Sequence, residues 1–132
     1  MQGIRIRDLD EDNYLVFDLK EVLSALGQRA LKSEWRCSVE EFLSSEDDYA
    51  SLESAYNSGR RIAGNELYGM AERTHQVIYG VFEAFEPGGE APWVRVEAVD
   101  SSFCEVFSLD RKVLAAVSTA FNTVERVEDE AS

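Results

Sequence analysis

The sequence is short of basic residues. Its 132 residues include 13 Lys and Arg against 26 Asp and Glu, so the formal net charge is -13 at pH 7. A surface of that sign repels the phosphates of nucleic acids and anionic membranes, and it attracts basic proteins. We therefore expect no binding to nucleic acid or to a membrane surface, and we expect the partner to be a basic protein.

Cysteines and long apolar runs are also scarce. The two cysteines, Cys37 and Cys104, lie far apart in the sequence, which is typical of reduced thiols in a cytosolic protein and not of a disulfide framework. No apolar run approaches the ~20 residues of a membrane-spanning helix. The first residues, MQGIRIRDLDEDN, lack the apolar segment of a secretory signal. We therefore expect a cytoplasmic protein.

Length and periodicity predict one α+β domain over residues 1–132. The hydrophobic fraction of 45% is ordinary for a globular protein, so the acidity does not indicate disorder. Several segments alternate apolar and polar residues, and others space their apolar residues as a helix does. The expected fold is a mainly antiparallel sheet with helices packed on one face. The expected strands cover 3–9, 32–39, 76–86, 93–99, 103–109 and 123–128, and the expected helices cover 18–27, 46–73 and the residues after Asp110.

Capping residues and turns mark several boundaries. Asp18 followed by Glu21 resembles a capping box, and Asp110 suits the N-cap of the last helix. The apolar stripe of that helix, which ends at Phe121, is expected to cover the valine face of the 93–99 strand. Over 46–73 one long helix is slightly preferred to two helices that break at Asn57-Ser58-Gly59, although an interior Gly costs up to about 1 kcal/mol.

The acids are concentrated in one segment. From Cys37 to Gly59 the sequence has six acids and no Lys or Arg. This segment is the predicted partner-binding surface. An alternative is that the acids of a first helical turn are there because the helix dipole favours them. The six candidates are Glu40, Glu41, Glu46, Asp47, Asp48 and Glu53.

Trp93 is a further candidate for partner binding. Strand alternation would place it with Arg95 and Glu97, on the face opposite Val94 and Val96. An exposed Trp beside charged residues would suit a binding hot spot. The alternatives are that both faces of the sheet are covered, or that Trp93 packs at the sheet edge.

No motif predicts catalysis, a metal site or a cofactor. His75 is the only histidine and lies at an expected helix-to-strand junction, with no nucleophile or orienting acid beside it in the sequence. Cys37 and Cys104 fall on expected strands, where cysteine is usually buried. The acidic run at 10–13 lacks the Gly and the distal Glu of a calcium loop. We therefore favour a non-enzymatic role.

Three functions remain open from the sequence. The leading hypothesis is an acidic binding protein that holds a basic partner, such as an immunity protein or antitoxin against a nuclease-like toxin, or an inhibitor that imitates nucleic acid. The second is a small-molecule-binding protein or enzyme with a pocket between sheet and helices, near His75 or Tyr79. The third is a homodimer with a structural role for an apolar or aromatic sheet face.

Overall fold

The computed structural model describes residues 2–12, 14–43, 46–74, 76–100 and 102–128, and for residues 41–43 and 76 it describes the backbone alone. His75 lies outside the described residues. In chain order the elements are β1 (Gln2–Ile6), α1 (Leu19–Leu26), α2 (Gln28–Lys32), β2 (Glu34–Leu43), α3 (Glu46–Asn57), β3 (Ile62–Ala63), α4 (Gly64–Arg73), β4 (Gln76–Phe85), β5 (Val94–Val99), β6 (Phe103–Ser108), α5 (Arg111–Ala120) and β7 (Val124–Glu128).

The strands form one sheet in the order β3-β2-β4-β5-β6-β1-β7. Every neighbouring pair is antiparallel, and β4, β5 and β6 form the predicted three-stranded meander. The first strand of the chain, β1, lies between β6 and the last strand, β7. The predicted α+β class, a mainly antiparallel sheet with helices on one face, is confirmed.

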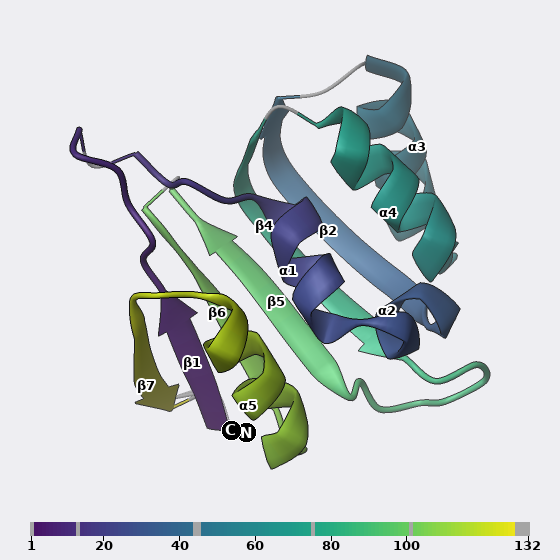
Figure 1. Cartoon of the computed structure of the whole chain (residues 1–132). Helices are drawn as coiled ribbons and strands as arrows, with labels where there is room; N and C mark the ends of the chain where they lie inside the picture. Colours follow the sequence, from purple (N-terminus) through teal and green to yellow (C-terminus); the bar gives the residue numbers. More distant parts are fainter. Residues whose placement is uncertain (1, 13, 44–45, 75, 101, 129–132) are drawn as a thin grey trace.

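One face of the sheet is covered by four helices, α1, α2, α4 and α5 (Figure 1). The hydrophobic core lies between these helices and the sheet. Fully buried core side chains include Ile6, Trp35, Phe82, Val96 and Val117. The short strand β3 pairs with only the first two residues of β2, and α3 lies against β2. A helix beside an otherwise unpaired strand protects it from pairing with another chain.

The predicted helix caps are confirmed. The Asp18 side chain accepts a hydrogen bond from the backbone of α1, and Glu21 completes the capping box. The Asp110 carboxylate accepts from the backbone N–H of Lys112, at 2.9 Å, and so caps α5. Capping fixes where α1 and α5 begin, because it satisfies backbone donors that have no partner within the helix.

The single long helix slightly preferred over 46–73 is wrong, and the alternative break is correct. Gly59 adopts a positive φ of 74°, a conformation that ends a helix and suits glycine. Gly64, expected inside the long helix, is the first residue of α4 and touches α2. A Cβ atom at Gly64 would lie 2.0 Å from the backbone oxygen of Ala30. The small residue is therefore required by the close contact between α2 and α4.

Phe121 is less buried than the sequence predicted. Leu114 and Val117 of α5 are buried, but Phe121 follows the helix as its C-cap and is half-buried. Its ring lies 4.9 Å from the ring of Phe17, centroid to centroid. The stripe of α5 therefore enters the core as expected, and its last member packs against the segment that precedes α1.

The second face of the sheet is protected by its own charged side chains. The guanidinium of Arg5 lies 4.4 Å from the ring centre of Phe103, and that of Arg95 lies 4.5 Å from the ring centre of Phe107. Arg5 also forms an ion pair with Glu105 at 2.8 Å. Aromatic rings covered by cations in this way leave less bare apolar surface for a second copy of the chain to bury.

Candidate functional site: the acidic end

The sheet topology gathers carboxylates at one end of the molecule. The antiparallel registers place the last residues of β1, β2 and β5 beside the first residues of β4 and β6. The loops and the helix start at that end lie at the top of Figure 1. We call this surface, together with the exposed side of α3 that continues from it, the acidic end. It is defined by its exposed carboxylates, Asp10, Glu11, Asp12, Glu40, Glu46, Asp47, Glu53 and Asp100.

Three of the predicted partner-binding acids are exposed on α3. Glu46 and Asp47 lie in its first turn, and Glu53 follows about two turns later on the same side as Glu46. The N-terminal end of a helix dipole stabilises acids by roughly 0.3–1 kcal/mol each, so their position also has a local structural reason. Stabilisation by the dipole does not remove their charge, and they remain available to a partner.

Asp48 has a different environment from its neighbours. It is buried, and its two carboxylate oxygens each accept a hydrogen bond from Arg73 at 3.1 Å. The hydrogen bond to Asp48 raises the pKa of Arg73. Asp48 therefore joins the first turn of α3 to the last turn of α4, and it does not belong to the free acidic surface on which the sequence placed it.

Glu40 lies at an irregularity in β2. Val39 is opposite Gly80 and Glu41 is opposite Tyr79, so Glu40 is the extra residue of a β-bulge. Bulges redirect side chains relative to a regular strand, and the Glu40 side chain is exposed. The side chain of Glu41, the remaining predicted acid, lies outside the described part of the structure.

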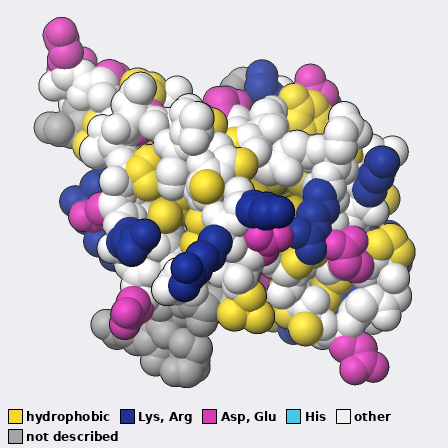
Figure 2. Space-filling model, turned by 60° about the horizontal axis from the view of Figure 1, so that its bottom comes forward, with side chains coloured by type: hydrophobic (Ala, Val, Ile, Leu, Met, Phe, Trp, Pro, Cys, Tyr) yellow, Lys and Arg dark blue, Asp and Glu magenta, His cyan; other side chains and the backbone are white. Residues whose placement is uncertain are grey.

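The exposed acids are not neutralised within the molecule. Among the described residues, no ion pair joins Glu40, Glu46, Asp47 or Glu53 to a basic side chain. Figure 2 brings the opposite end forward and shows several Lys and Arg side chains in a row across it. At that opposite end acidic side chains lie among the basic ones and form ion pairs with them, so the two ends differ in how far their charges are paired.

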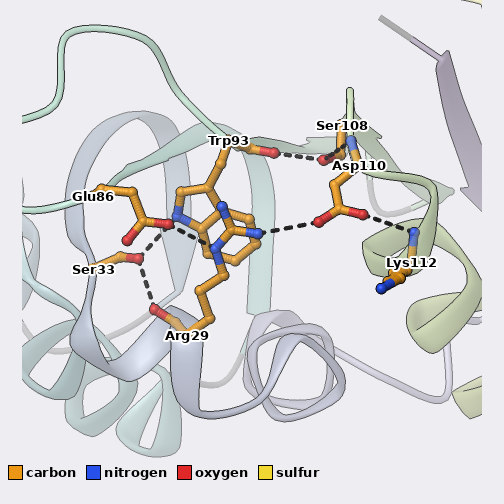
Figure 3. A network of polar contacts seen from close by, with 7 residues as sticks. All are labelled: Arg29, Ser33, Glu86, Trp93, Ser108, Asp110 and Lys112. Carbon is orange, nitrogen blue, oxygen red and sulfur yellow. Dashed lines mark hydrogen bonds and ion pairs between the residues drawn. The ribbon is translucent and has the colours of Figure 1, made fainter.

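Trp93 lies away from the acidic end and is buried, so the expected exposed anchor is wrong. Its indole N–H donates to the Ser33 hydroxyl at 2.9 Å, and the Arg29 guanidinium lies 4.1 Å from its ring centre (Figure 3). Arg29 is held in turn by Glu86 and Asp110. Trp93 lies just before β5, where strand alternation no longer determines the direction of a side chain.

The two thiols are buried. Cys37 and Cys104 are buried in the core, as predicted, and burial raises the pKa of both thiols. In the described ranges no three His, Cys, Asp or Glu side chains are grouped to hold a metal ion. No described helix is long and apolar enough to cross a membrane.

A cleft lies between α5 and the strands β1 and β7. Its volume is about 690 Å³. The lining combines apolar side chains, such as Ile4 and Leu114, with two bases, Arg111 and Arg126, and two acids, Glu125 and Glu128. This cleft is not the pocket expected near Tyr79, because Tyr79 lies on β4 and β4 does not line the cleft.

Sequence reasoning did not select one part of the acidic end, the acids at 10–12 in the projecting loop between β1 and α1. The apolar YLVF segment at 14–17, which closely follows these acids, was a usable signal. No protein-family model, curated protein or solved structure matches the chain.

Proposed function

We propose that this protein is a non-enzymatic binding protein whose acidic end holds a basic partner. An immunity protein or antitoxin that blocks a nuclease-like toxin has this role, and so does an inhibitor that imitates nucleic acid. One observation carries the proposal. Exposed carboxylates that form no ion pair among the described residues are gathered at one end of the molecule, whereas basic and acidic side chains lie together and pair at the other.

The physical reason is electrostatic steering. Unpaired acids on one part of a surface orient the protein as it approaches a basic surface, which raises the association rate and rejects acidic competitors. Exposed charges are screened beyond ~8 Å at physiological ionic strength, so neighbouring unpaired acids contribute most to this effect. Glu46 and Asp47 are such neighbours: they are adjacent and exposed in the first turn of α3.

The test is affinity capture from the source cell with the full chain as bait. We expect a basic protein to be retained at low salt and released at high salt, because exposed charge pairs weaken as ionic strength rises. A variant with Glu46, Asp47 and Glu53 changed to Lys should lose that protein.

A matched control changes the net charge equally at other sites. Glu66, Glu90 and Glu128 are exposed and form no ion pair within the described residues, and they lie outside the acidic end. Changing these three to Lys should leave capture intact. Equal loss with both variants would mean that only net charge matters, which contradicts a binding role for the acidic end.

The cleft beside α5 supports a second candidate function, the binding of a small molecule that carries both charges. Arg111 and Arg126 would contact its negative group, and Glu125 and Glu128 would contact its positive group. A panel of amino acids and other small zwitterions, screened by thermal shift, tests this function. A ligand of the cleft should raise the melting temperature of the wild type and not that of Ala115→Trp, which places a bulky side chain in the cleft.

A further inference from the structure

The loop between β1 and α1 combines exposed apolar side chains with acids. This loop has described residues 8–12 and 14–16, which project from the body of the protein at the upper left of Figure 1. Leu9 is 39% exposed, Tyr14 69% and Val16 60%. These are three of the five large apolar side chains exposed in the described part of the chain. Apolar side chains gathered on one projection indicate an interaction site.

Backbone hydrogen bonds hold the loop in one shape. The N–H of Asp10 donates to the carbonyl of Tyr14 at 2.8 Å, and the N–H of Val16 donates to the carbonyl of Asp8 at 2.9 Å. The Asp10 carboxylate accepts from the N–H groups of Asp12 and Tyr14. A loop ordered before binding loses less conformational entropy when a partner contacts it.

The base of the loop is fixed to the body. The buried Asp8 carboxylate accepts hydrogen bonds from the backbone N–H groups of Asn122 and Thr123, with the shortest at 2.6 Å. Phe17, just beyond the loop, packs against Phe121. Both contacts tie the loop to the connection between α5 and β7. Both ends of the loop are therefore anchored to the body of the protein.

The charge on the loop determines which kind of partner it can bind. Asp10, Glu11 and Asp12 are exposed, and no described base forms an ion pair with them. Two copies of the loop would repel each other, so a second copy of this chain is a poor partner for it. A cleft with basic walls and an apolar floor is complementary to the acids and to the side chains of Tyr14 and Val16.

We propose that the loop of residues 8–16 inserts into a cleft of the partner that is walled by Lys and Arg, with Tyr14 and Val16 as its apolar anchors. This inference rests on the proposed function, since it names the surface that holds the basic partner. The two parts of the acidic end then act differently. The acids of α3 steer association, and the anchors slow dissociation.

Binding kinetics with the captured protein test the inference. Apolar anchors at the centre of an interface carry about 2 kcal/mol or more, so Tyr14→Ser with Val16→Ser should raise the dissociation rate about 30-fold or more and leave the association rate nearly unchanged. Leu109→Ser is the matched control, because Leu109 is 81% exposed and follows β6, away from the loop. Equal melting temperatures would show that all three proteins are folded.

Photocrosslinking identifies what the loop touches. A benzophenone side chain at position 14 should link to the captured basic protein, and one at position 109 should not. A crosslinked dimer of this chain through position 14, or a link at 109 alone, would overturn the inference.

The two proposals fail differently. If the loop variant binds like the wild type while the α3 reversal loses binding, the loop is not the anchor but the proposed function stands. If no basic protein is captured in a salt-dependent way, the proposed function fails, and the inference that depends on it fails too.

Discussion

Asp48 and Arg73 join two helices that are separate in the sequence. Both carboxylate oxygens of Asp48 accept hydrogen bonds from the Arg73 guanidinium, each at 3.1 Å. The pair fixes the start of α3 against the end of α4, and so it sets where Glu46 and Asp47 stand at the acidic end. One acid of the cluster therefore positions the others.

Asp48→Asn should lower the melting temperature, because it breaks a contact between α3 and α4. It should change the association rate with a basic partner much less than the loss of Glu46 and Asp47 would, because both exposed charges remain in the first turn of α3. Breaking a paired, buried carboxylate removes hydrogen bonds to a charged group, which are stronger than neutral ones. Thermal denaturation of Asp48→Asn, Arg73→Leu and the double variant forms a double-mutant cycle. Strictly additive losses would contradict the coupling between the two side chains.

Asp18 predicts a specific dependence of stability on pH. Burial raises the pKa of this carboxyl above its usual value, so folding favours its protonated form. Burying the charged carboxylate lowers the free energy of unfolding. This loss of stability is absent below the unfolded pKa of 3.8, and it becomes complete as pH rises through the folded pKa. Asp18→Asn keeps the capping oxygen without the charge, so it should be at least as stable as wild type at pH 7. This relative advantage should shrink as the solution is acidified below the folded pKa, in melts recorded as a function of pH.

The contact between α2 and α4 predicts opposite effects for two glycines of one helix. Gly64→Ala should destabilise the protein by about 1–3 kcal/mol, because the new methyl group collides with the backbone of α2. At Gly69 the nearest atom is a flexible Arg73 nitrogen 3.5 Å away, so Gly69→Ala should stabilise α4 by up to about 1 kcal/mol. Urea denaturation measures both values. A tolerated Gly64→Ala would mean that the two helices are farther apart.

Trp93→Ala should damage stability and not the binding site. Removing a buried aromatic side chain costs about 3–5 kcal/mol, a large part of the stability of a small domain. The variant should therefore melt earlier, and at a temperature where it remains folded it should bind a basic partner as the wild type does. A protein that keeps its melting temperature but loses binding would restore Trp93 as an anchor.

Local sequence signals predicted most of the fold. Alternation located the meander of β4, β5 and β6, and Asp18 and Asp110 marked the starts of α1 and α5. The break at Gly59 was harder to predict, because the apolar spacing continues through it and only its positive φ ends the helix. Local patterns say little about such backbone conformations.

The site was less predictable because it depends on long-range pairing. Glu46 and Asp47 were found as acids, but the position of Asp10–Asp12 at the same end of the sheet follows from the insertion of β1 between β6 and β7. No spacing in the sequence encodes that order. The pairing of Asp48 with Arg73 across 25 positions was invisible for the same reason.

The most direct test of the account is the association rate of a captured basic partner, measured by stopped-flow mixing at several salt concentrations. Changing Glu46, Asp47 and Glu53 to Lys should slow association about tenfold or more at low salt, with little change in dissociation. The same charge change at Glu66, Glu90 and Glu128 should have a much smaller effect. Equal association rates for the two triple variants would contradict the claim that the acidic end binds the partner.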